Sequence, residues 1–176
     1  MVPIHYAALL ALATLLRAFS LRRNLLLHGS WGEAMVANTI AAHFPRPHIL
    51  LNNVTLPTED GTTQIDHILI ADTGIFILET KHYQGWIYGG ENQSQWTQAI
   101  YKKKSRFQNP IRQNYGHLKT LQSLFTLTPA HFIPAVVFTG AAEFKTDLGS
   151  SVLQLGQLIP FLTQPRPVVF DERKMA

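Results

Sequence analysis

The sequence contains no cysteine, which excludes disulfide bonds, thiol nucleophiles and zinc–thiolate sites. Charged residues are also sparse at 15% of the chain, and the formal net charge is only +4. Such a small positive excess is compatible with a phosphate-bearing partner but does not by itself indicate one. The sequence has no internal repeat and no low-complexity tract, and its hydrophobic content of 46% is sufficient for one domain with a real core.

The N-terminal segment lacks an uninterrupted apolar run long enough to cross a membrane. Residues 6–16 carry no charge, but these 11 residues are fewer than the roughly 20 that a spanning helix needs. Two interpretations stay open. The first is a membrane contact through residues 4–21, at the inner face of the cell membrane because arginines follow the apolar run. The second is a helix that packs on the domain or on a partner.

These patterns predict three parts of the chain. Residues 1–28 form an N-terminal apolar and basic helix, residues 29–163 form the folded domain, and residues 164–176 form a loose C-terminal tail. A chain without disulfides suits a reducing compartment, so we expect a cytoplasmic protein.

Two central strands, residues 65–70 and 75–81, are predicted to form a hairpin. Residues 71–74 between them have the turn chemistry of a short loop, and both strands are aliphatic on both faces, which is typical of covered strands. If these four residues are the loop, Asp66 faces Glu79 across the hairpin.

A charged cluster is therefore expected at one end of an aliphatic surface. Lys81 shares a face with Glu79, because residues two apart on a strand point the same way. Opposed carboxylates destabilise a sheet unless a charge compensates them, and the hard oxygen ligands of Asp66 and Glu79 suit Mg²⁺ or Mn²⁺. The alternative is a solvated Glu-x-Lys ion pair on a half-exposed strand. The aliphatic neighbours favour a functional site.

Helices are predicted on both sides of this hairpin. One starts at Ser30, and its Glu33 has two interpretations: the third residue of a capping box, or an inward carboxylate on a buried stripe with Ala37 and Ile40. The other starts at Asn109-Pro110, with Asn as the N-cap and Pro at the first helical position. Its apolar stripe comprises Ile111, Leu118, Leu121 and Phe125.

Shorter elements complete the expected domain. Strands are predicted at residues 49–56, 86–88, 132–138 and 151–153, with residues 86–88 as an edge strand, and a last helix at residues 155–162. Pro134 indicates an edge or a bulge within its strand. The pattern of residues 96–107 does not decide their secondary structure.

Taken together, these motifs resemble the NERD (nuclease-related) domain, a branch of the PD-(D/E)xK restriction-endonuclease-like superfamily. The matching pieces run from about residue 29 to 137: Gly32-Glu33, Gln64-Ile65-Asp66-His67, Gly74-Ile75-Phe76, Glu79-Thr80-Lys81, Gly85, Trp96, Asn109-Pro110-Ile111, Gln113-Asn114 and His117. The resemblance implies an α/β fold, namely a restriction-endonuclease-like central mixed β-sheet flanked by helices. It also implies a metal-dependent site that cleaves phosphodiester bonds.

The resemblance carries over a set of site residues. Glu33, Asp66, Glu79 and Lys81 form the implied catalytic set, with Gln113 as an auxiliary polar residue and Glu33, Asp66 and Glu79 as ligands of Mg²⁺ or Mn²⁺. The expected substrate is nucleic acid, with DNA ahead of RNA. The alternatives are a non-catalytic module that binds nucleic acid or protein, and a membrane-tethered scaffold.

Basic residues outside this set are candidates for phosphate contacts: Lys102, Lys103, Lys104, Arg106 and Arg112. A solvated loop is the alternative for the lysine run. Trp86, Tyr88 and Trp96 either stack on bases or pack in the fold, and packing is favoured. We expect structural roles for His67 and His82. His117 could reach the site from its helix, but a structural hydrogen bond is favoured for it.

Overall fold

The computed structural model describes residue 14, residues 31–125 and residues 127–170 of the chain. The predicted N-terminal segment, the Ser30 cap and the end of the C-terminal tail lie outside these residues. Within the described part, no helix is both long and apolar enough to cross a membrane.

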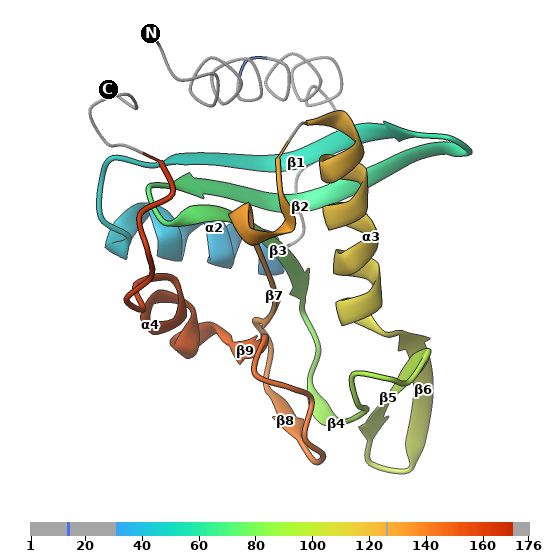
Figure 1. The fold of residues 1–176 in the computed structure, drawn as a ribbon. Coiled ribbons are helices and arrows are strands. Elements are labelled where there is room, and N and C mark those ends of the chain that lie inside the picture. The colour runs from blue at the N-terminus through green and yellow to red at the C-terminus, as the bar shows by residue number, and fades with distance from the viewer. Residues whose placement is uncertain (1–13, 15–30, 126, 171–176) are drawn as a thin grey trace, which may run out of the picture.

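A mixed five-stranded sheet forms the centre of the molecule (Figure 1). Its strands, in spatial order, are β1 (Ile49–Thr58), β2 (Gly61–Ala71), β3 (Gly74–Lys81), β7 (Phe132–Phe138) and β9 (Val152–Gln154). The first three strands are antiparallel, and β7 and β9 run parallel to β3 and to each other. The predicted mixed sheet is therefore confirmed.

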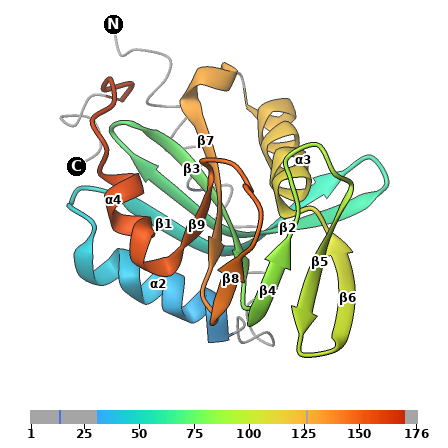
Figure 2. The same ribbon diagram turned by 90° about the horizontal axis from the view of Figure 1, so that it is seen from below.

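The sheet separates two hydrophobic cores because β3 is apolar on both faces. Ile75 and Ile77 pack in the core that includes Leu118 of helix α3 (Pro110–Leu124). Phe76 and Leu78 pack in the core that α2 (Trp31–His43) and α4 (Leu158–Leu162) cover. Figure 2 shows α3 on one side of the sheet and α2 with α4 on the other.

The predicted hairpin has the expected register but a tighter turn. Ile70 pairs with Ile75 and Ile68 with Ile77, as predicted. Ala71 also pairs with Gly74, so the loop consists of residues 72–73 rather than the four residues expected. The pairing continues as far as His67 opposite Leu78. Asp66 and Glu79 thus lie just past the last paired residues.

A second sheet was not predicted. Its order is β6 (Lys103–Gln108), β5 (Gln95–Ile100), β4 (Gly85–Tyr88) and β8 (Ala142–Phe144). The residues 96–107 without an assignment form most of the β5–β6 hairpin. The prediction of an edge strand at residues 86–88 was wrong, because β4 pairs with β5 on one side and β8 on the other.

The remaining predicted elements are present with small shifts. The expected last helix is a 3₁₀ turn, η2 (Leu155–Gln157), followed by α4, and a second 3₁₀ turn, η1 (Pro129–His131), precedes β7. Pro134 is accommodated as expected, because β9 pairs with β7 only from Val136 onward and leaves that side of Pro134 without a strand neighbour. The C-terminal segment up to Phe170 is not loose: the Phe170 ring is buried and its N–H donates to the carbonyl of Asp72.

Asn109 fixes the start of α3, and its replacement by alanine is expected to destabilise the protein by about 2–4 kcal/mol. Its Oδ1 accepts from the N–H of Ile111 (2.9 Å), and its Nδ2 donates to the carbonyls of Gly90 (3.3 Å), Glu91 (3.0 Å) and Gln93 (2.7 Å). The side chain is fully buried, so these partners would lose their bonds without gaining water. Urea denaturation measures the change.

The matched control is Asn38→Ala, at an exposed position of α2, which should change the free energy of unfolding by less than about 0.5 kcal/mol. If both variants were equally stable, the buried contacts of Asn109 would not contribute as described.

Candidate active site

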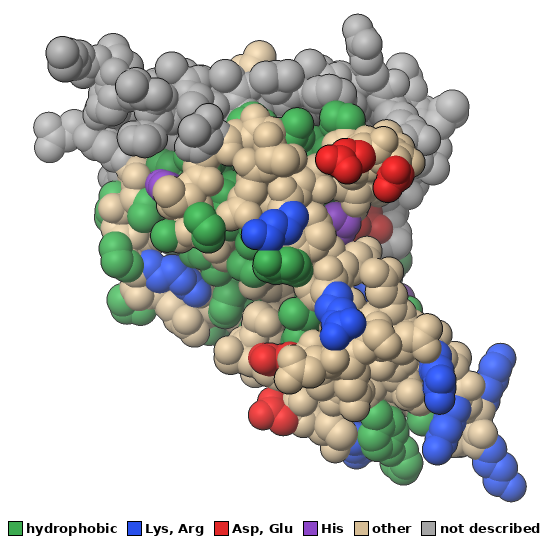
Figure 3. Space-filling model, turned by 45° about the vertical axis from the view of Figure 1, so that its right-hand side comes forward, with side chains coloured by type: hydrophobic (Ala, Val, Ile, Leu, Met, Phe, Trp, Pro, Cys, Tyr) green, Lys and Arg blue, Asp and Glu red, His purple; other side chains and the backbone are tan. Residues whose placement is uncertain are grey.

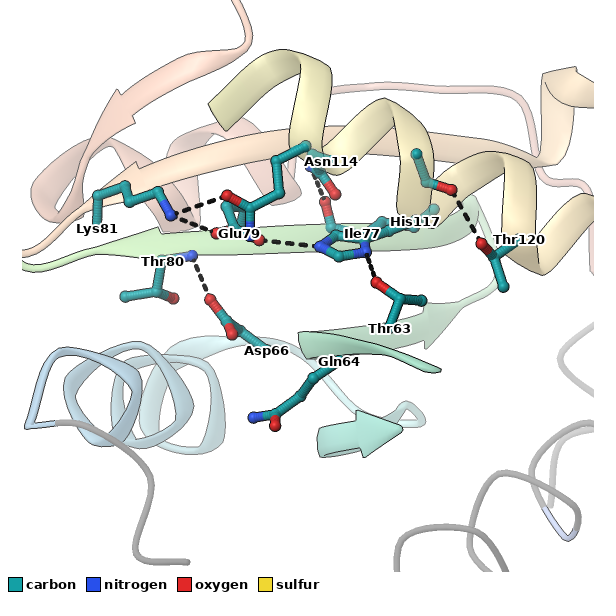
Figure 4. A network of polar contacts seen from close by, with 12 residues as sticks. Thr63, Gln64, Asp66, Ile77, Glu79, Thr80, Lys81, Asn114, His117 and Thr120 are labelled. Atoms are coloured by element: carbon teal, nitrogen blue, oxygen red, sulfur yellow. Dashed lines mark hydrogen bonds and ion pairs between the residues drawn. The ribbon is translucent and has the colours of Figure 1, made fainter. Parts of the chain in front are cut away.

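Glu79 lies at the centre of a polar network at the end of β3 (Figure 4). Its carboxylate is 2% exposed, and its Oε1 accepts a hydrogen bond from Lys81 Nζ at 2.6 Å. Lys81 Nζ also donates to Gln113 Oε1 on α3 at 3.1 Å. The predicted shared face of Glu79 and Lys81 is therefore present, and Gln113 reaches it from the helix as the sequence suggested.

His117 reaches the site from α3, which the sequence left as the less favoured of two interpretations. Its Nε2 lies 3.2 Å from Glu79 Oε2, and its Nδ1 lies 3.0 Å from the hydroxyl of Thr63. The structural role expected for His117 is correct, but its partner is the central carboxylate of the site. The signal was available, because Gln113 and His117 are one helical turn apart and point at the same strand.

Asn114 joins α3 to the sheet beside this network. Its Nδ2 donates to the carbonyls of Ile77 on β3 (2.8 Å) and Ala135 on β7 (3.0 Å), and the side chain is buried. The amide thus bridges two neighbouring parallel strands and fixes the height at which Gln113 and His117 meet β3. Sequence spacing alone could not reveal this role.

Asp66 approaches the network from β2. Its Oδ2 accepts the backbone N–H of Thr80 at 2.8 Å, between the positions of Glu79 and Lys81 (Figure 4). The pKa of Asp66 is raised to about 7, chiefly by burial and also by the negative charges of Glu79 and Glu33, whereas the Thr80 N–H and Lys81 act in the opposite direction. The positive charge around Asp66 is therefore too small to offset its burial and the neighbouring carboxylates.

Glu79 shows the opposite behaviour. Burial alone would raise its pKa, but the hydrogen bond with His117 and the ammonium of Lys81 outweigh burial and hold the pKa below its ordinary value. Two neighbouring carboxyl groups are thus driven apart in pKa, which is typical of sites that handle protons or cations.

Glu33 belongs to the same region, and its Oε2 is buried, as the interpretation of an inward carboxylate predicted. On α2, Val36 and Ile40 are fully buried, while Glu33 and Ala37 are half-buried, so the stripe is offset from the expected one. The negative charge of Glu33 also raises the pKa of Asp66.

Gly32 allows this approach of α2. A Cβ at this position would lie 2.6 Å from Thr139 Oγ1 and 2.8 Å from His82 Cβ, which is closer than atoms can pack. Only glycine lets the start of α2 come this near the end of β3.

Two further histidines have structural contacts, as expected. Burial lowers the pKa of His67 to about 4, and its Nδ1 lies 2.8 Å from Asn52 Oδ1. His82 Nδ1 lies 3.0 Å from Thr139 Oγ1. A neutral, buried His67 carries no charge into the site at neutral pH.

The predicted phosphate-binding residues divide into two groups. Lys102 lies in the β5–β6 turn, and Lys103, Lys104 and Arg106 lie on β6, all exposed (Figure 3). Arg112 lies instead on α3, where its guanidinium donates to the carbonyl of Asn92 at 2.8 Å. The lysines and Arg106 project from the second sheet rather than from the rim of the Glu79 network.

The donor set for a cation is small. Among the residues that the structure describes, no three His, Cys, Asp or Glu side chains lie close enough together to hold a metal ion. Asp66 and Glu79 lie on neighbouring strands, and the charge of Glu79 acts on the Asp66 carboxyl. Mg²⁺ commonly uses only one or two protein carboxylates, with water and substrate phosphates as its other ligands.

Comparisons with known proteins show the family of the chain. The sequence model of a family described as the nuclease-related domain matches residues 28–139. Over 97 residues the chain is 53% identical to an uncharacterized protein of Bacillus anthracis, a match that covers 54% of this chain and 46% of that protein. The chain therefore spans about half the length of this relative.

A solved crystal structure of a protein of unknown function also resembles the fold, with a TM-score of 0.40 and 13% identity over 74% of this chain and 53% of the other. That likeness is too weak to carry an argument. The family match covers well over half of the chain and includes every residue of the Glu79 network. This protein belongs to the nuclease-related domain (NERD) family.

Proposed function

We propose that this protein is a Mg²⁺- or Mn²⁺-dependent phosphodiesterase that hydrolyses nucleic acid, with DNA as the first substrate to test. The observation that carries the proposal is the Glu79–Lys81–Gln113 network at the end of β3, with Asp66 of β2 bonded to the N–H of the intervening Thr80 and within the electrostatic reach of Glu79 and Lys81. Membership of the nuclease-related family supports the same chemistry.

The carboxylates fit a hard divalent cation. The raised pKa of Asp66 marks a buried carboxyl that lacks positive charge, and both Asp66 and Glu79 offer oxygen ligands. A bound Mg²⁺ or Mn²⁺ would supply polarisation of a phosphoryl oxygen and a bound water of lowered pKa. Glu33 would lie outside the first ligands and would add negative charge behind Asp66.

Lys81 would stabilise the charge that develops on the phosphoryl group. An ammonium has three N–H donors, and those of Lys81 donate to Glu79 and Gln113. These two bonds fix the direction of the third N–H. In the reaction, the oxygen of water forms a bond to phosphorus, the ester P–O bond breaks, and the leaving oxygen gains a proton. Gln113 and His117 would act by holding Lys81 and Glu79 in place.

One observation favours the alternative of a non-catalytic binding module. Both oxygens of Glu79 already have protein partners, Lys81 and His117, so a cation would have to share them. A carboxylate oxygen that accepts a hydrogen bond can still bind a cation, whereas a site without the carboxylate cannot. The presence of Asp66, Glu79 and Lys81 together therefore supports catalysis.

The test is hydrolysis of labelled DNA by the purified full chain in Mg²⁺, in Mn²⁺ and in EDTA. We expect cleavage only with a metal. Gln113→Ala should reduce the rate by about tenfold, as expected for the loss of a group that orients an active-site residue. Gln122→Ala, on the same helix but without a contact to Lys81, is the control. Absence of cleavage of both DNA and RNA in either metal would favour the binding module.

A further inference from the structure

An open pocket of about 490 Å³ lies on the second sheet, a short distance along the chain from Lys81. Its walls include Trp86 on β4, Ala99 and Ile100 on β5 and Tyr101 in the β5–β6 turn. Trp86 pairs with Ala99 across the β4–β5 ladder, so a large ring lies beside a small side chain. The floor of the pocket is thus apolar, and the small side chain of Ala99 leaves space beside the Trp86 ring.

Two aromatic rings at this pocket are exposed, although Trp86 also contacts the side chains of Lys145 and Glu143. Trp86 is 48% exposed, and Tyr101 is fully exposed with a φ of 53°. A bulky residue in this left-handed conformation is uncommon, because glycine or asparagine suits it better. Trp96, in contrast, is fully buried and packs in the core. Exposed rings at a pocket indicate a binding surface.

Cations occupy the same face in a regular arrangement. Lys104 of β6 pairs with Ala99, which pairs with Trp86, so these three side chains form one row across the sheet. Two residues further on, a second row is formed in the same way by Arg106, Thr97 and Tyr88. Each row has a cation on β6 and an aromatic ring on β4. We call the face that carries these two rows the outer face.

The charge of the outer face is positive overall. Glu143 on β8, which pairs with Trp86 across the ladder, is ion-paired with Lys145, and the Lys145 Nζ lies 4.9 Å from the centre of the Trp86 ring. Lys102 and Lys103 add further positive charge at the same hairpin. Figure 3 shows Lys and Arg side chains gathered at this tip of the molecule, next to exposed hydrophobic ones.

We propose that the outer face binds single-stranded nucleic acid. The repeat of cation and ring matches the chemical repeat of a strand, with phosphates on Lys104 and Arg106 and an unpaired base stacked on Trp86. A duplex presents phosphates but keeps its bases stacked inside, whereas a single strand offers each base to an aromatic ring. Binding of the strand does not depend on the proposed function. Only the statement that the bound strand is the substrate rests on it.

The position of the outer face suits such a substrate. Gln84 and Gly85 also line the pocket. Gln84 is the last of the three residues, 82–84, that connect Lys81 of β3 to Gly85 of β4. A strand seated against Trp86 would therefore lie on the segment that directly follows β3 along the chain.

Binding is measured by fluorescence anisotropy with a labelled deoxythymidine oligonucleotide of roughly ten nucleotides, a length within the usual site sizes. EDTA prevents cleavage. Trp86→Ala should weaken binding by about tenfold, because base–aromatic stacking contributes that much affinity. Trp86→Phe should restore most of it. Tyr115→Ala is the matched control, since Tyr115 is 55% exposed on α3 beneath the ammonium of Lys119 and lies away from the pocket.

An abasic oligonucleotide of the same length separates stacking from general damage. The wild type should bind it about tenfold more weakly, and Trp86→Ala should bind it as the wild type does. Lys104→Glu should weaken both oligonucleotides and reduce the salt dependence, because it removes a phosphate contact. Uridine and deoxyuridine oligonucleotides then show whether the sugar matters.

Three results would overturn the inference. The first is no binding of the oligonucleotide, and the second is an equal loss of affinity for normal and abasic strands in Trp86→Ala. The third is tighter binding of a duplex, with an affinity that Trp86→Ala does not change. Concentration-dependent self-association abolished by Trp86→Ala would assign the face to a second copy of the chain. Each outcome is independent of hydrolysis. A protein that binds the strand through Trp86 but cleaves nothing in Mg²⁺ would contradict the proposed function alone.

Discussion

Replacing Lys81 by methionine is expected to reduce the rate of phosphodiester hydrolysis by about 10²–10³-fold, the usual cost of removing one preorganised charge-stabilising donor. Methionine keeps an unbranched side chain of similar length but cannot donate to a phosphoryl oxygen. In the structure the Lys81 ammonium is held by Glu79 and Gln113, so its position is fixed before any substrate arrives. The rate of DNA cleavage at saturating Mg²⁺ measures the effect.

The control is Lys119→Met, because Lys119 is exposed on α3 and contacts only the ring of Tyr115 among the described interactions. Lys81→Arg should recover little activity, since a planar guanidinium does not reproduce the point charge of an ammonium. Thermal unfolding of each variant shows whether the fold survives. A folded Lys81→Met protein that keeps more than about a tenth of the wild-type rate would exclude Lys81 as the charge-stabilising group.

Replacing Asp66 by asparagine is expected to stabilise the metal-free protein at pH 8 by up to about 4 kcal/mol. The pKa of Asp66 is about 7 in the folded protein against an ordinary value of 3.8, chiefly because the carboxyl is buried. The folded state therefore keeps this proton longer than the unfolded state, so the free energy of unfolding falls as the pH rises from about 4 to about 7 and then levels off. Asparagine cannot ionise, and its oxygen can still accept the Thr80 N–H.

Urea denaturation in EDTA between pH 4 and pH 8 measures this difference. Adding Mg²⁺ at pH 8 should stabilise the wild type and leave Asp66→Asn nearly unchanged, because a ligand stabilises only the state that binds it. Asp60→Asn, in the exposed β1–β2 turn, should change stability by less than about 0.5 kcal/mol at every pH. If wild type and Asp66→Asn had the same pH dependence, the carboxyl would not be in the environment described.

The central part of the fold could be predicted because local signals agreed with one another. Aliphatic residues on both faces of residues 75–78 required cover on both sides, and the turn chemistry fixed the register that places Ile68 opposite Ile77. Asn109 followed by proline marked the start of α3. Each of these signals acts within a few residues, so no tertiary information was needed.

The rest depended on contacts between distant segments. The strands of the second sheet are only three to six residues long, and β4 finds its partners on β5 and β8, which the sequence pattern does not specify. In the site, the register placed Asp66 near Glu79 but could not show that the aspartate accepts the Thr80 N–H. His117 and Asn114 became understandable only once α3 lay across β3.

The short connection between β3 and β4 has a mechanical consequence. Tyr83, in this connection, packs edge-on against Phe107 of β6 and Phe138 of β7, with ring centres 4.7 Å and 6.2 Å apart. The middle of the connection is thus packed against one strand of each sheet, which limits its movement. A displacement of the second sheet would therefore move Lys81, the last residue of β3. Pulling on a strand bound to the second sheet would then shift the Lys81 ammonium.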